Sequence, residues 1–161
     1  MPKHLIIFLC YIVVCCCKPQ AVFAQLQTYK FTQIDSLQKI EPRPIFIFIY
    51  TTWCKYCMAM KQTTFKNKAI IATLNNKFYA VFLNAETKEN IVFNNHLFKY
   101  KATGNHVGSH ELAQQLSIIN KQVVYPTTCI LNVQKEIILQ HSNYIEAVSL
   151  KYYLNKVLVN K

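Results

Sequence analysis

Continuous apolar runs and apolar residues at helical spacing follow one another along the chain, which predicts both strands and helices. Between Gln27 and Ile40 an apolar residue recurs every three positions, as on one face of an amphipathic helix. The segment 45–50 is continuously apolar and rich in β-branched and aromatic side chains, which is typical of a strand buried on both faces of a sheet. The segment 78–83 predicts a second buried strand.

The segment between these two strands has helical spacing over residues 54–74, although Thr63 and Thr64 could interrupt the helix. Residues 51–53 form the turn that leads into it. A strand, a helix and a second strand in close succession are typical of a βαβ unit, in which the strands are parallel and the crossover is right-handed.

The segment 84–120 has a less regular pattern. It predicts a short strand at 98–101 and a turn or loop at 103–108. A helix is expected to begin after Ser109, which would serve as its N-cap, and to include Leu112 on its apolar face.

The last part of the chain predicts a β-hairpin and a closing helix. Strands at 127–133 and 135–140 would be joined through Gln134, and a helix would follow at 144–159. The expected apolar positions of that helix are Ile145, Val148, Tyr152 and Leu154. Taken in order, the elements predict an α/β fold with a central mixed sheet and helices on both faces.

The first residues have the parts of a signal peptide: a polar start with Lys3, an apolar run over residues 5–17, and small residues before a cleavage site after Ala24. The apolar run is shorter than the roughly 20 residues that a membrane-spanning helix needs. We therefore favour cleavage over a retained anchor. This divides the chain into a signal peptide, residues 1–24, and one domain of ordinary size, residues 25–161.

The formal net charge of +11 comes almost entirely from lysines, which are spread along the chain without a long basic cluster. Binding to nucleic acid is therefore not expected, because such proteins concentrate their charge. The two glycines, Gly104 and Gly108, argue against a glycine-rich phosphate loop or a dinucleotide fingerprint.

Cleavage would leave three cysteines, Cys54, Cys57 and Cys129. An odd number suits one close pair and one buried thiol better than a disulfide framework. A zinc site would need two further ligands, and the pair His106 and His110 is expected at the surface or in a loop, so no metal is expected. A purely structural disulfide and a redox role for Cys129 are the alternatives to this interpretation.

Cys54 and Cys57 lie at the expected start of a helix. Unpaired N–H groups and the positive end of the helix dipole there favour a thiolate on Cys54 and lower its pKa. Lys55 adds a neighbouring positive charge. Cys57, about one turn further along, can then attack a mixed disulfide on Cys54 and release the product.

Three features together resemble the thioredoxin superfamily: the apolar strand at 45–50, Trp53 directly before the Cys-x-x-Cys pair, and the distant sequence Tyr125-Pro126-Thr127. The resemblance covers roughly residues 45–159. It is strongest to exported bacterial thioredoxin-like proteins and to the reducing periplasmic domains of transmembrane electron-transfer proteins. It implies a thioredoxin-like three-layer sandwich.

The resemblance also implies roles for residues around the pair. In the family the proline is cis and packs against the cysteines, where the backbone of its neighbour can pair with a bound peptide, so Pro126 and Tyr125 take these positions. Trp53 and an exposed Tyr56 are further expected substrate contacts.

Two departures from the family change this expectation. Lys55-Tyr56 stands where thioredoxin has Gly-Pro, and Phe48 stands where thioredoxin has a buried aspartate that accepts the proton of the second cysteine. Without that acid, deprotonation of Cys57 must rely on water or another group.

We therefore expect an exported, periplasmic thiol–disulfide oxidoreductase, with the reducing direction slightly favoured. Its partners would be protein thiols or disulfides and a membrane electron-transfer donor, and its redox-active group would be the Cys54–Cys57 disulfide without a further cofactor. The alternatives are a disulfide oxidase or isomerase of folding proteins and a non-catalytic thioredoxin-fold binding module.

The expected signal peptide gives a first testable prediction. Protein purified from its native host should begin at Gln25, because the apolar run is short and small residues precede the predicted cleavage site. Mass spectrometry of the intact protein would measure this. A chain that still carries Met1, or a lipid on a cysteine, would contradict it.

Overall fold

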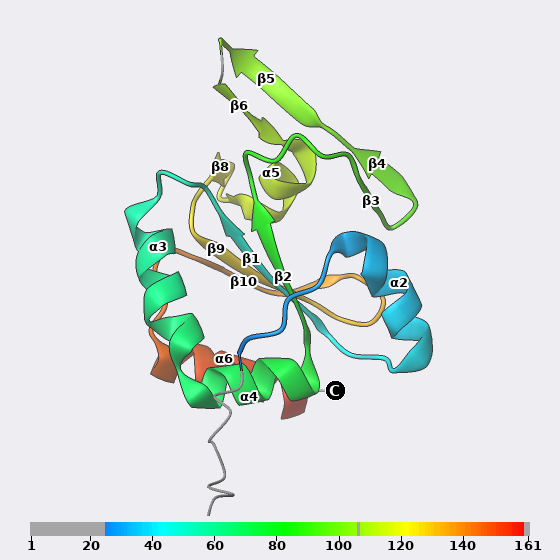
Figure 1. Ribbon diagram of the computed structural model, residues 1–161, viewed down its shortest axis with the longest axis vertical. Helices are drawn as coiled ribbons and strands as arrows, with labels where there is room; N and C mark the ends of the chain where they lie inside the picture. Colours follow the sequence, from blue (N-terminus) through cyan, green and yellow to red (C-terminus); the bar gives the residue numbers. More distant parts are fainter. Residues whose placement is uncertain (1–24, 106, 160–161) are drawn as a thin grey trace, which may run out of the picture.

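A four-stranded sheet in the order β10-β9-β1-β2 lies at the centre of the fold (Figure 1). The computed structural model describes residues 25–105 and 107–159, so the expected signal peptide lies outside the described residues. The strands are β1 (Ile45–Tyr50), β2 (Tyr79–Asn84), β9 (Thr127–Leu131) and β10 (Ile137–Ser142). The helices are α2 (Phe31–Ile40), α3 (Lys55–Gln62), α4 (Lys68–Lys77), α5 (Glu111–Ser117) and α6 (Ala147–Val159). None of these described helices is both long enough and apolar enough to cross a membrane.

Strands β1 and β2 are parallel, whereas β9 is antiparallel to both of its neighbours, β1 and β10. The sheet is therefore mixed, as the sequence predicts. The connection from β1 to β2 contains α3, a 3₁₀ turn η1 (Thr64–Lys66) and α4. The break expected near Thr63 does occur, and Asn67 begins α4 by accepting hydrogen bonds from the N–H groups of Ala69 and Ile70.

Successive residues of β1 point to two apolar cores, one on each face of the sheet. Ile45, Ile47 and Ile49 pack with α2 and α5 on one face. Phe46 and Phe48 pack with α3, α4 and α6 on the other face. Figure 1 shows α2 and α3 on opposite sides of the sheet, which confirms the predicted sandwich of a mixed sheet between helices.

Cys129 lies on the opposite face of the sheet from the cysteine pair. It is paired with Ile47 across the β1–β9 ladder and belongs to the core beneath α2, whereas Cys54 and Cys57 belong to the core beneath α3. Its thiol is free and fully buried, and burial raises its pKa to about 12. The prediction of a buried thiol is confirmed, and its placement does not support a redox role.

The predicted apolar positions of the closing helix are confirmed in part. Ile145 and Leu154 are buried as expected, whereas Val148 and Tyr152 are 80% and 63% exposed and Leu150 is fully buried instead. Apolar residues occupy several sides of this helix, so periodicity alone does not select the buried stripe. Met58 of α3 is also exposed, at 42%.

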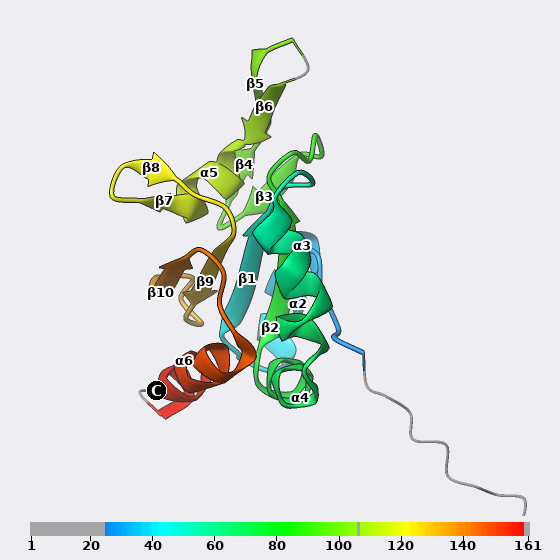
Figure 2. The same cartoon turned by 90° about the vertical axis from the view of Figure 1, so that its left-hand side faces the viewer.

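The segment between β2 and β9 forms three short hairpins and α5 beyond the end of the sheet at which β1 and β2 finish (Figures 1 and 2). The predicted strand at 98–101 is wrong, because Lys99 separates two strands of different hairpins. The expected loop at 103–108 lies largely within a hairpin that projects from the body of the fold. The hairpins pair β3 (Ile91–Phe93) with β4 (His96–Phe98), β5 (Tyr100–Gly104) with β6 (Val107–His110), and β7 (Ile118–Ile119) with β8 (Gln122–Val123).

His110, rather than the predicted Ser109, is the N-cap of α5. Its Nδ1 accepts a hydrogen bond from the N–H of Leu112 at 3.3 Å, and its Nε2 lies 3.1 Å from the carbonyl oxygen of Glu89. The ring is fully buried, and this burial lowers its pKa. The expectation that His110 lies at the surface is therefore wrong, since a neutral imidazole serves here as a buried structural group.

The position of Cys129 gives a second prediction. Because of its burial and raised pKa, Cys129 should resist alkylation by iodoacetamide in the folded protein at pH 8 and react only after unfolding. Cys129→Ser should lower the free energy of unfolding by about 1–3 kcal/mol, because it places a hydroxyl without a hydrogen-bond partner in the core. The substitution should leave the rate of thiol–disulfide exchange unchanged. Urea denaturation and an exchange assay measure both quantities, with Cys129→Ala as the control that adds no polar group. Loss of exchange in a folded Cys129→Ser protein would contradict the assignment.

Candidate active site

Cys54 caps the N-terminus of α3 with its own sulfur. Its backbone is extended, with φ −76° and ψ 106°, and its Sγ accepts a hydrogen bond from the N–H of Cys57 at 3.1 Å. The two sulfurs are joined in a disulfide. One of the N–H groups that a helix leaves unpaired at its start therefore points at Cys54 Sγ, as the sequence predicts.

The two cysteine residues differ in exposure to solvent. Cys54 is 6% exposed, whereas Cys57 is completely buried in the core with Met60 and Phe65. A thiolate formed on Cys54 would therefore be the one that an approaching disulfide can reach.

Two aromatic pairs lie beside the disulfide. The Trp53 ring is 70% exposed and lies 6.5 Å from the ring of Tyr125 in an edge-on arrangement. The Tyr56 ring is 67% exposed and lies 6.5 Å from the ring of Tyr144. The structure thus brings three of the expected substrate contacts next to the pair, and adds Tyr144, which the sequence did not single out.

The peptide bond between Tyr125 and Pro126 is cis. Tyr125 is partly buried and packs against both apolar cores, and this burial raises the pKa of its hydroxyl. The carbonyl oxygen of Pro126 accepts a hydrogen bond from the N–H of Asn143, which fixes the start of β9 to the segment after β10. Through its contact with Trp53, Tyr125 places this turn beside the start of α3.

Glu86 fixes the turn that precedes the cysteine pair. One oxygen of its carboxylate accepts hydrogen bonds from the N–H and the hydroxyl of Thr52 at 2.6 and 2.7 Å. Glu86 follows β2, and the turn follows β1, so the parallel strands bring both segments to the same end of the sheet. This positioning residue was missed in the sequence, where only its place directly after a predicted strand could have indicated it.

A phenylalanine stands at position 48, and a lysine follows Cys57 by one helical turn. Phe48, which replaces the family aspartate, is fully buried and stacks on Tyr50 with ring centroids 5.7 Å apart. The ammonium of Lys61 lies 3.1 Å from the centroid of the Tyr50 ring. Lys61 is one helical turn after Cys57, at the i, i+4 spacing that places two side chains on the same face. Burial lowers the pKa of Lys61.

Lys55, the first residue of α3, is exposed beside Cys54. No group of three or more His, Cys, Asp or Glu side chains in the described part of the chain is arranged to hold a metal ion. The described residues of this site place two sulfurs at a helix N-terminus.

Comparisons with known proteins agree with this geometry. A family model described as "Thioredox_DsbH: Protein of unknown function, DUF255" matches residues 27–159. No curated protein sequence matches the chain.

Several solved structures are similar to this one. A protein described as "DsbH Oxidoreductase" is 14% identical over 87% of this chain and 88% of its own, with a TM-score of 0.53. A thioredoxin from Thermus thermophilus is 16% identical over 84% and 88% of the two chains, with a TM-score of 0.60. The reduced C-terminal domain of DsbD from Neisseria meningitidis is 12% identical over 78% and 90%, with a TM-score of 0.51. At these identities the likeness shows the thioredoxin-like fold.

Proposed function

Because this chain belongs to the DsbH-like thioredoxin family, we propose that it is a thiol–disulfide oxidoreductase that exchanges disulfides with protein thiols. The observation that carries this proposal is the hydrogen bond from the N–H of Cys57 to Cys54 Sγ at the N-terminus of α3. The same N–H group would stabilise a thiolate on Cys54 in the reduced protein.

In the reducing direction the reaction has two steps. The Cys54 thiolate attacks one sulfur of the substrate disulfide, so that a mixed disulfide forms and the other substrate sulfur leaves as a thiolate. Cys57 then loses its proton and attacks Cys54 Sγ, which releases the second substrate thiolate and leaves the Cys54–Cys57 disulfide. The substrate gains two electrons, and an external dithiol must return the protein to its reduced form.

We propose the reducing direction because of the resemblance to reducing periplasmic domains, and the periplasm because of the apolar run near the N-terminus. A membrane electron-transfer protein is the proposed donor of the external dithiol. The reduction potential would test the direction: known couples extend from about −270 mV for reductants to about −120 mV for a strong oxidant. A value near the oxidising end would favour an oxidase.

Substrate contacts in this proposal come from the aromatic side chains around the pair. Trp53 and Tyr56 are exposed on either side of Cys54 in the sequence, and Tyr125 and Pro126 lie beside Trp53. Flat, exposed rings next to a reactive sulfur can pack against an extended polypeptide while its disulfide is attacked.

Trapping of mixed disulfides tests the two cysteine roles. Cys57→Ser should accumulate substrate linked through Cys54, because the second step is blocked, whereas Cys54→Ser should trap little, because Cys57 is buried. Non-reducing gels and mass spectrometry would identify the linked sulfur, and insulin reduction would measure turnover. A preference for Cys57 in trapping or in alkylation would contradict the assignment. Turnover near the uncatalysed rate, with binding that survives loss of both cysteines, would indicate a binding module.

Lys61 has a proposed role in the second step. Its positive charge, one helical turn from Cys57, would stabilise the thiolate that must form there in the absence of an acid at position 48. Lys61→Met should therefore slow the release of substrate from the mixed disulfide by about tenfold at pH 7, which corresponds to about 1.4 kcal/mol of lost thiolate stabilisation. The pH at which this step becomes fast should also move upward, because the pKa of Cys57 would rise.

Stopped-flow measurement of the release step across pH would test this prediction. Lys61→Arg, which keeps the charge, is the matched control and should retain most of the rate. Equal release rates and pH profiles in the wild type and Lys61→Met would exclude the role, even if the substitution lowers stability.

A further inference from the structure

The helices on the disulfide side of the sheet carry positive charge alone. The elements α3, η1, α4 and α6 contain seven lysines and no aspartate or glutamate. On the other side, α2 contains Asp35 and Lys39, and α5 contains Glu111. We call the first surface the lysine face; its lysines are Lys55, Lys61, Lys66, Lys68, Lys77, Lys151 and Lys156.

Ion pairs are found on the opposite side of the molecule. Arg43 pairs with Glu41 after α2, and Lys135 pairs with Asp35 of α2. Lys101 of β5 pairs with Glu111 of α5. Acids thus balance bases around α2 and α5, whereas the described helices of the lysine face contain lysines and no acid. Two acids flank these helices: Glu86 holds the turn before Cys54, and Glu146 directly precedes α6.

The lysine face begins at the reactive sulfur. Lys55 follows Cys54 directly, and Lys66 lies in η1, immediately beyond α3. Helix α3 has 8 residues and is therefore about 12 Å long. A typical protein partner covers roughly 800 Å² of this protein, an area equal to a disc of about 16 Å radius. When the disulfide of such a partner meets Cys54, the partner would therefore cover α3 and reach η1.

Apolar side chains are exposed among these lysines. Tyr56 of α3 and Val148 and Tyr152 of α6 are each more than 60% exposed. Exposed aromatic and aliphatic groups rimmed by charged residues are typical of a surface that contacts a partner.

We propose that the lysine face docks an acidic surface of the disulfide-bearing protein partner and steers it onto Cys54. This inference rests on the proposed function and adds to it the charge of the substrate. Cations spread over one face attract an acidic partner before contact, which raises the association rate and makes it fall with salt. A protein partner is favoured over a lipid surface because the face is continuous with Cys54, which only a disulfide-bearing molecule can engage chemically.

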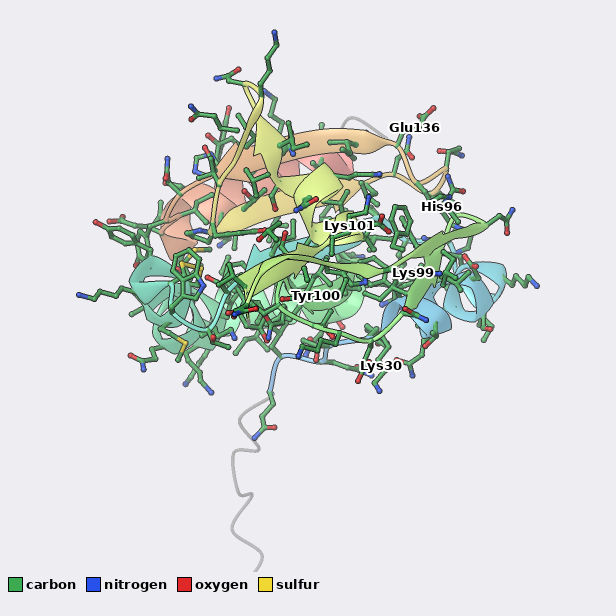
Figure 3. All side chains as sticks on the ribbon, turned by 90° about the horizontal axis from the view of Figure 1, so that it is seen from above. Lys30, His96, Lys99, Tyr100, Lys101 and Glu136 are labelled. Carbon is green, nitrogen blue, oxygen red and sulfur yellow. A yellow bond between two sulfur atoms is a disulfide. The ribbon has the colours of Figure 1, made fainter. Side chains whose placement is uncertain are left out.

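Two charge-reversed proteins isolate this effect. Lys66→Glu/Lys151→Glu removes charge from the lysine face at two exposed positions outside the cysteine site. Lys39→Glu/Lys99→Glu changes the net charge equally on the other side. Figure 3 shows Lys99 on the side of α2, away from α3.

The exchange experiment uses two synthetic peptides with the same central disulfide, flanked by glutamates in one and by lysines in the other. At low salt the reduced protein should react about tenfold faster with the acidic peptide. The difference should vanish near 1 M salt, where the Debye length is about 3 Å. Lys66→Glu/Lys151→Glu should lose most of the preference, and the control should keep it. Equal rates for the two peptides, or equal losses in both variants, would overturn the proposal.

A binding experiment separates this proposal from the proposed function. The double variant Cys54→Ser/Cys57→Ser cannot exchange disulfides, yet it should bind a fluorescent glutamate-rich peptide that has no cysteines. Adding Lys66→Glu/Lys151→Glu to this variant should weaken the binding several-fold. If the peptide binds in this way but the wild type exchanges no disulfides, the proposed enzymatic function is rejected and the proposed docking surface is supported. The same protein is mixed with phosphatidylcholine vesicles with and without phosphatidylglycerol. Binding to the anionic vesicles that depends on Lys66 and Lys151, without binding of the acidic peptide, would assign the face to lipid and overturn the proposal.

Discussion

The hydrogen bond from the N–H of Cys57 to Cys54 Sγ is the interaction on which the candidate site depends. It exists because α3 begins at this point, after residues 51–54, which follow a strand whose six residues are almost entirely buried. Glu86 holds the intervening turn through Thr52, and the parallel pairing of β1 with β2 brings Glu86 there. A sulfur in a strand or in the middle of a helix would lack this preorganised donor, because the first turn of a helix is where N–H groups are left unpaired.

The sheet also determines which thiols can react with one another. Side chains alternate between its faces, so a cysteine on β9 opposite Ile47 is directed into the core beneath α2. The cysteine pair lies in the core beneath α3, which contains Phe48 and Phe65 instead. The sheet thus lies between Cys129 and the disulfide, and the high pKa of Cys129 keeps it protonated.

Most of the central fold could be predicted from the sequence, because β1, β2 and the cysteine-bearing helix have strong local patterns. The chemistry of Cys54 and Cys57 followed from their place between that strand and that helix. Burial of His110 and the contact of Glu86 with Thr52 could not be predicted, since both depend on chain segments brought together by tertiary structure. The buried positions of the closing helix were predicted only in part, because a helix with apolar residues on several sides carries no unique periodic signal.

The distribution of charge connects the chemistry of the site to its surroundings. No acid lies between Glu41 and Glu86, a stretch that includes β1, α3 and α4. Lysines within about one Debye length, roughly 8 Å at physiological salt, can act on the sulfurs themselves, and Lys55 and Lys61 are the nearest along the helix. Lysines beyond that distance contribute little to a thiolate but still attract a large acidic partner that extends over them. One acid-free segment can therefore favour the reactive anion and select the charge of the molecule that meets it.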